Sequence, residues 1–166
     1  MKFNRHRLIL GLCVLALIVI TELVTQPLKL PAWPAYVTWV LFFVEHMNPK
    51  RAPHILLGAA AGIGLVILAP SVIGLLAHLI GADWGRLIYI LAAVYAIFAF
   101  GEMIPLVLNS HTFMLFTVAG LALATPHPNP PLWLLMAAAG GGLLIGATIV
   151  AGRLIGAPAA AQPATE

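Results

Sequence analysis

The chain of 166 residues is 62% hydrophobic and only 8% charged, and its mean hydropathy is +1.05. Soluble domains carry about 25% charged residues, so this composition excludes an ordinary soluble protein and predicts one that crosses a membrane several times. The net charge of +3 does not predict nucleic-acid binding, because the basic residues are scattered at the ends of apolar runs and do not interleave with exposed aromatic residues.

The composition also argues against an enzyme or a metalloprotein. Cys13 is the only cysteine and lies in an apolar run, which excludes disulfide frameworks and thiolate metal sites. Ser71 and Ser110 are the only serines, and no general base is spaced to activate either of them. No histidine or carboxylate pair has the i, i+3 or i, i+4 spacing of a metal site on one helix, so we expect no metal, no other cofactor and no catalysis.

The basic N-terminus followed by apolar residues 8–20 has the layout of a signal peptide. Residues 21–25 offer no small-x-small cleavage site. We therefore expect a retained first span.

Six apolar runs predict six helical spans, and a span needs about 20 residues to cross a bilayer. They are residues 8–24, 33–47, 54–80, 87–100, 104–124 and 132–155. The second is short enough for a tilted or re-entrant helix, Pro70 makes the third either one kinked span or two half-spans, and the fifth could be broken or straight. The predicted fold is an all-α, polytopic transmembrane bundle of about six spans with one or two short, kinked or re-entrant helices. Residues 1–155 would form one domain, followed by a disordered tail over 156–166.

Glycines in the third and last runs predict close helix packing. Gly58 and Gly62 are four positions apart, and so are Gly142 and Gly146. This small-xxx-small spacing lets helix backbones approach one another.

The basic residues predict the orientation. With six spans, most basic residues lie on one side of the membrane, and Lys29 and Arg86 lie on the other. The larger group consists of Lys2, Arg5, Arg7, Lys50, Arg51 and Arg153. By the positive-inside rule this puts both termini in the cytoplasm.

The densest polar segment, residues 101–112, interrupts otherwise apolar sequence. Asn109 and His111 would lie five to seven residues into the fifth span, about 8 to 10 Å deep at 1.5 Å per residue. The topology places Glu102, Glu45 and His54 on the same side. Polar residues at such depth are costly and often functional, so these five residues are candidates for lining a pathway. The alternative is that they join helices by hydrogen bonds or meet water at the boundary.

Two segments resemble those of a known family. The run 30–39 reads LPAWPAYVTW and continues to Phe42 and Phe43, while residues 104–120 combine a proline with a Thr-Phe pair before a small-residue helix. Both are similar to the YcdZ-like family of small bacterial inner-membrane proteins of unknown function. The resemblance departs at residues 45–49, where that family tends to carry glycines. It implies a multi-pass protein of the bacterial inner membrane and leaves the activity open.

The leading hypothesis is a small channel or transporter subunit for a polar solute or ion, embedded in the lipid bilayer and assembled as a homo-oligomer. The alternative is a non-transporting scaffold whose glycine faces dock another membrane protein.

Overall fold

The computed structural model describes residues 5–155, and all regular elements in this range are helices. In chain order they are α1 (Arg5–Thr25), α2 (Trp33–Val44), the 3-10 helix η1 (Pro49–Arg51), α3 (Ala52–Ile80), α4 (Ala82–Phe100), α5 (Ser110–Ala122), α6 (Pro130–Leu135), the π-helical η2 (Met136–Gly140) and α7 (Gly141–Leu154). The all-α prediction is confirmed. The predicted tail over 156–166 lies outside the described residues.

Within residues 5–155, four helical segments are long and apolar enough to cross a membrane: Leu8–Thr25, Pro49–Ile80, Ala82–Phe100 and Pro130–Leu154. The other two apolar helices are short, with 12 residues in α2 and 13 in α5. The protein is therefore a transmembrane helical bundle with two short helices. The sequence predicts the short second helix, whereas the predicted fifth run over residues 104–124 is longer than α5.

The third apolar run forms one helix. α3 continues for 29 residues through Pro70, and the hydroxyl of Tyr89 donates a hydrogen bond to the Leu65 carbonyl just before that proline. Gly81 alone separates α3 from α4, and its φ of 86° is open to glycine but costly for other residues. α4 consequently begins at Ala82 and not at Leu87.

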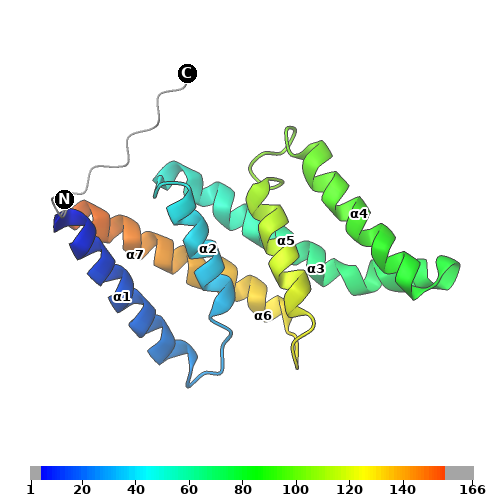
Figure 1. Ribbon diagram of the computed structural model, residues 1–166, viewed down its shortest axis with the longest axis horizontal. Coiled ribbons are helices and arrows are strands. Elements are labelled where there is room, and N and C mark those ends of the chain that lie inside the picture. Colours follow the sequence, from blue (N-terminus) through cyan, green and yellow to red (C-terminus); the bar gives the residue numbers. More distant parts are fainter. Residues whose placement is uncertain (1–4, 156–166) are drawn as a thin grey trace.

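The helices form two crossing sets (Figure 1). α3 and the continuous α6, η2 and α7 segment run along the long axis, and α3 touches α6 and η2 near the middle. α1 and α2 pack across α7, whereas α4 and α5 pack across α3. The fully buried side chains of Phe42, Ile55, Ile63 and Leu115 lie where the short helices cross the long ones.

The chain contains an internal repeat. Residues 59–67 read AAAGIGLVI and residues 137–145 read AAAGGGLLI, so the two stretches differ only at their fifth and eighth positions. An Asn-Pro pair precedes each of the two long helices, at Asn48-Pro49 and at Asn129-Pro130. Each half of the protein therefore consists of a long, a short and a long helical segment: α1, α2 and α3, then α4, α5 and α6 to α7.

The short helices bury the same positions relative to one another. Both contain an i, i+1, i+4, i+5, i+8 set, with Pro34, Ala35, Thr38, Trp39 and Phe42 in α2 and His111, Thr112, Leu115, Phe116 and Ala119 in α5; α2 buries Leu41 in addition. A half-turn in the plane of Figure 1 brings α1, α2 and α3 approximately onto α4, α5 and α7, with chain directions preserved. The two halves are thus related by an approximate two-fold axis along the view.

Glycines at matching positions make the closest helix contacts. A Cβ added to Gly62 would lie 2.8 Å from the Phe116 nitrogen and would also clash with the Thr112 carbonyl oxygen. A Cβ on Gly140, the fourth residue of the second repeat, would lie 2.9 Å from the Ala35 Cβ. Each long helix therefore uses a glycine to admit the short helix of the other half.

Candidate functional site

The end of α2 turns back to place a carboxylate beside a guanidinium. Glu45 caps α2, and His46 and Met47 both have a φ of 55° in the turn that follows. Asn48 then starts η1 by accepting a hydrogen bond from the Lys50 backbone nitrogen at 3.0 Å. This reversal brings the Arg51 Nε within 2.9 Å of a Glu45 carboxylate oxygen.

α5 begins at Ser110, which corrects the prediction of a span starting at Ile104. Residues 101–109 form turns, and Asn109 is the N-cap. Its side-chain oxygen accepts hydrogen bonds from the backbone nitrogens of His111 and Thr112, at 2.9 and 3.2 Å, while the Thr112 hydroxyl accepts one from the Asn109 nitrogen. A capping box of this kind satisfies the free donors of a first helical turn. Asn109 and His111 consequently lie at the start of the helix and not five to seven residues inside it.

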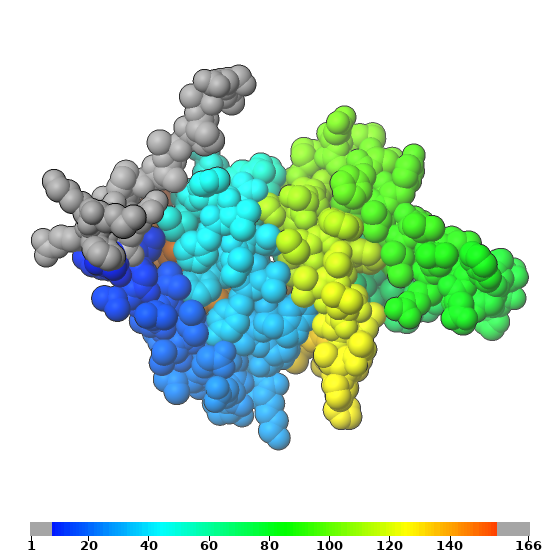
Figure 2. Space-filling view, viewed as in Figure 1, coloured from blue at the N-terminus to red at the C-terminus, as the bar shows by residue number. Residues whose placement is uncertain are grey.

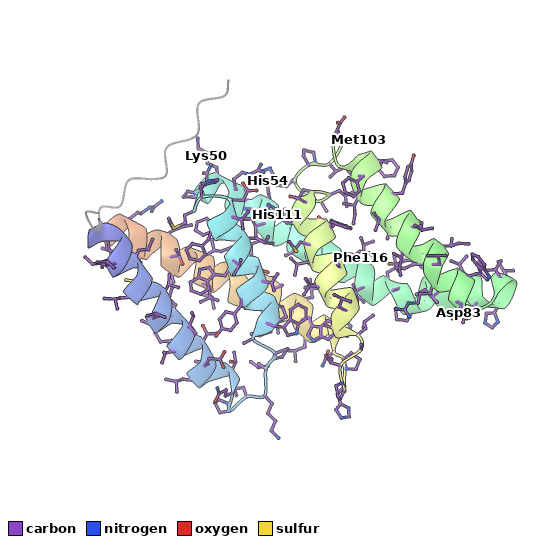
Figure 3. The ribbon with its side chains drawn as sticks, viewed as in Figure 1. Lys50, His54, Asp83, Met103, His111 and Phe116 are labelled. Carbon is purple, nitrogen blue, oxygen red and sulfur yellow. The ribbon has the colours of Figure 1, made fainter. Side chains whose placement is uncertain are left out.

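Four of the five predicted pathway residues come together at this point (Figure 3). His111 is only 4% exposed, and its Nε2 lies 3.2 Å from the Glu45 carboxylate. The Asn109 amide donates to the His54 carbonyl at 3.2 Å. We name Glu45, Arg51, His54, Asn109 and His111 the polar cluster. The fifth predicted residue, Glu102, is exposed in the loop before α5 and does not join it.

The polar cluster ties the two halves together. Glu45 and His54 belong to the first half, and Asn109 and His111 to the second. Gly58, on the first turns of α3, is packed directly against Asn109, since an added Cβ would lie 3.1 Å from the Asn109 Nδ2 and from the His111 Cβ. This end of the contact between the halves is therefore closed by side-chain bonds.

The electrostatics of the cluster centre on Glu45. The hydrogen bond from the Arg51 guanidinium holds the pKa of the Glu45 carboxyl below its ordinary value of 4.5. The carboxylate is therefore charged at neutral pH. The His54 Nδ1 is buried and has no hydrogen-bond partner among the described residues.

The contact between the two halves is open at the end opposite the polar cluster. A cavity of about 440 Å³ lies between the loop before α2 and the loop before α6, lined by Lys29, Trp33, Thr125, His127 and Trp133 among others. The rings of Trp33 and Trp133 meet edge to face, with centroids 5.3 Å apart. Figure 2 shows the surface notched between these two loops. We name this cavity the open vestibule.

The two further glycines predicted to pack helices are placed differently. A Cβ on Gly142 would reach only ordinary contact with Leu56, at 3.8 Å, and one on Gly146 would meet nothing within 4 Å. Their neighbours Gly140 and Gly141 make the close contacts with α2 instead.

Sequence reasoning missed Arg51 as a site residue and missed the open vestibule. From the sequence alone, Arg51 is only an orientation signal, and His127 has no site role. The repeated AAAG stretch and the repeated Asn-Pro pair were the signals available, because a repeat predicts that the two short helices occupy equivalent places.

Comparisons with known proteins do not supply a function, so a functional proposal rests on the polar cluster and the open vestibule. No family model matches the chain, and neither a curated protein nor a solved structure matches it. The likeness to the YcdZ-like family stays a prediction. Across residues 5–155, no group of three or more histidine, cysteine or acidic side chains is placed to hold a metal ion.

Proposed function

We propose that this protein is a small transporter for a polar solute or ion in the bacterial inner membrane, with the path running between α2 and α5. The observation that carries the proposal is the internal repeat, with a short helix at the same place in each half. Many transporters are built from inverted halves, and paired short or interrupted helices in such halves point to the substrate path.

The path is closed at one end and open at the other. The bonds of Glu45 to His111 and of Asn109 to the His54 carbonyl hold the first end shut. The open vestibule gives access from the second end. This asymmetry is what one state of an alternating-access protein requires.

The repeat supports a second state of similar energy. Gly62 receives α5 and Gly140 receives α2 at matching positions, so either short helix can serve as the pivot for movement of the other half. In that second state the polar cluster separates and the loops around the open vestibule meet. A packed core has discrete alternative arrangements, which suits such a two-state exchange.

The basic residues support an orientation. Lys50 and Arg51 lie at the closed end (Figure 3), and by the positive-inside rule that end faces the cytoplasm with both termini. The open vestibule then faces outward. Within this proposal Glu45 and His111 form the inner gate, and Asn109 positions His111 by capping α5.

The test is flux through purified protein in vesicles. Lys29 and His127 line opposite loops of the open vestibule, so Lys29→Cys with His127→Cys, in a Cys13→Ala background, can be joined by a bismaleimide. We expect the parent to pass at least one of protons, sodium, potassium, chloride, glycerol or urea faster than protein-free vesicles. Cross-linking should abolish that flux.

The matched controls are the two single cysteine variants treated with the same reagent, which should keep at least half of the flux because nothing bridges the loops. Inserted parent protein that passes none of the six probes would contradict the proposal. So would undiminished flux after complete cross-linking.

A second candidate function is a scaffold subunit, favoured by the outer face of α7. Gly146 has open space around it and Leu143 is 75% exposed, so another helix could pack there, from a second copy or from a different membrane protein. A stoichiometric foreign protein recovered from native membranes would favour the scaffold. A pure homo-oligomer is compatible with transport.

A further inference from the structure

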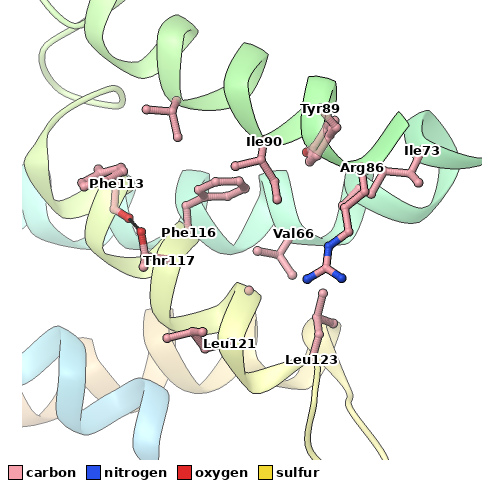
Figure 4. A pocket seen from close by; sticks show the side chains of 13 residues that line it. Val66, Ile73, Arg86, Tyr89, Ile90, Phe113, Phe116, Thr117, Leu121 and Leu123 are labelled. Carbon is pink, nitrogen blue, oxygen red and sulfur yellow. Dashed lines mark hydrogen bonds between the residues drawn. The ribbon is translucent and has the colours of Figure 1, made fainter. Parts of the chain in front are cut away.

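A second cavity lies on the other flank of α5. It has a volume of about 440 Å³ and opens between α4 and α5, with α3 as its floor (Figure 4). Val66 and Ile73 form part of the floor, and Ile90, Phe116 and Leu121 form part of the walls. We name this cavity the lateral groove.

The polar side chains on its walls are already bonded, with one exception. The Tyr89 hydroxyl donates to the Leu65 carbonyl, and the Thr117 hydroxyl donates to the Phe113 carbonyl at 2.9 Å. The rings of Phe98 and Phe113 approach to 5.6 Å beside the far end. The lateral groove therefore presents an apolar surface along most of its length.

The exception is Arg86. It has no hydrogen bond or ion pair in the described part of the chain, and Figure 4 shows its guanidinium at one end of the lateral groove, near Leu123. Trp84, two residues earlier, is 65% exposed, as expected of an aromatic residue at the level of lipid headgroups. A guanidinium offers a rigid fork of donors that matches a phosphate.

The matching place in the first half is bridged by a hydrogen bond. There the Tyr36 hydroxyl donates to the Glu22 carboxylate at 2.8 Å and ties α2 to α1. Across the described residues no hydrogen bond joins α4 to α5. The walls of the lateral groove therefore have no such bridge between them.

We propose that the lateral groove binds one acyl chain of an anionic bilayer phospholipid, whose phosphate is held by Arg86. Charge complementarity identifies the headgroup, because Arg86 lies at the mouth and has no bonded partner within residues 5–155. The α4 part of the lining runs from Arg86 to Val94, about 12 Å at 1.5 Å per residue. That is close to the depth of one leaflet, half of a hydrocarbon core of about 30 Å. Basic sites between transmembrane helices are known to select anionic lipids.

Native mass spectrometry of the full-length protein in detergent tests this site. The probes are phosphatidylglycerol and phosphatidylcholine with identical acyl chains. We expect the parent to bind phosphatidylglycerol at least fivefold more tightly than phosphatidylcholine. Arg86→Gln should remove most of that preference, since only the charge is lost. Lys29→Gln, a cation outside the lateral groove, should leave it unchanged.

A second variant tests the acyl-chain half of the proposal. Gly120 lines the lateral groove and has open space around it, so Gly120→Phe fills the groove while keeping Arg86. We expect this variant to weaken the binding of both lipids at least fivefold and to keep the helical circular dichroism of the parent. Parent-like binding in Arg86→Gln or in folded Gly120→Phe would overturn the proposal. So would a lipid-free dimer as the only species, because a second copy would then occupy the groove.

Discussion

At the scale of single residues, Glu45 links the Arg51 guanidinium to the His111 imidazole in the polar cluster. One carboxylate accepts from the Arg51 guanidinium at 2.9 Å and faces the His111 imidazole at 3.2 Å. Glu45 joins a turn in the first half to a helix start in the second. Its charge state therefore matters for how firmly this end stays shut.

The pKa of Glu45 predicts an acid-sensitive contribution to stability. Because Arg51 holds this pKa below 4.5, the folded state is stabilised fully at pH values above 4.5, and the contribution is lost as the pH falls through the lowered pKa. We expect Glu45→Gln to lower the midpoint of thermal unfolding at pH 7 and to approach the parent at pH 3. Tryptophan fluorescence of the protein in detergent measures both.

Glu102→Gln is the matched control, since Glu102 is an exposed acid in the loop on the same side. Its unfolding midpoint should follow the parent at every pH. If the unfolding midpoints of Glu45→Gln and the parent differed by the same amount at pH 7 and at pH 3, that result would count against a lowered pKa of Glu45.

At the scale of elements, α3 owes its packing to glycine placed on one face. Gly62 faces the backbone of α5, whereas Gly64, two positions on, has nothing within 4 Å of an added Cβ. The backbone atoms that oppose Gly62 belong to Thr112 and Phe116 and cannot rotate away as a side chain could. A methyl group at Gly62 therefore separates two helices, and one at Gly64 does not.

We predict opposite signs for alanine at these two positions. Gly62→Ala should destabilise the protein by about 1 to 3 kcal/mol, the usual cost of overpacking. Gly64→Ala should stabilise it by up to about 1 kcal/mol, because alanine favours a helix over glycine. Reversible unfolding of detergent-solubilised protein, with the parent alongside, measures both. A neutral Gly62→Ala would mean that α5 does not sit as closely on α3 as the structure places it.

At the scale of the whole molecule, the short helices decide the topology. α2 has 12 residues and spans about 18 Å at 1.5 Å per residue, less than a hydrocarbon core of about 30 Å. The chain on either side of α2 must complete the crossing. Irregular backbone is tolerated at that depth only where protein or water surrounds it, and the loops around the open vestibule provide such surroundings.

We predict that both short helices cross the membrane. In a Cys13→Ala background, Lys50→Cys and Met103→Cys should react with a membrane-impermeant maleimide from one side, and Gln26→Cys and His127→Cys from the other. Comparing right-side-out with inverted vesicles shows from which side of the membrane each cysteine is labelled. Labelling of Gln26→Cys and Lys50→Cys from the same side would mean that α2 enters and leaves by one face, which the inverted repeat does not allow.

The sequence by itself determined that this protein lies in a membrane and that it is built from helices. Apolar runs with few charges can satisfy their backbone in a membrane only as helices, so the helical bundle followed directly, and the short second run predicted the short helix α2. The start of α5 was misplaced because the apolar residues 104–108 suit a helix as well as a turn, and the capping box at Asn109 decided between them.

Only the tertiary structure decided which residues meet. Glu45 and His111 are far apart in the chain, and no local pattern connects a carboxylate after one helix to an imidazole at the start of another. The open vestibule and the lateral groove likewise arise where helices from distant segments cross or diverge. Hydropathy depends on each residue's own side chain, whereas a site depends on how the two halves pack around their approximate two-fold axis.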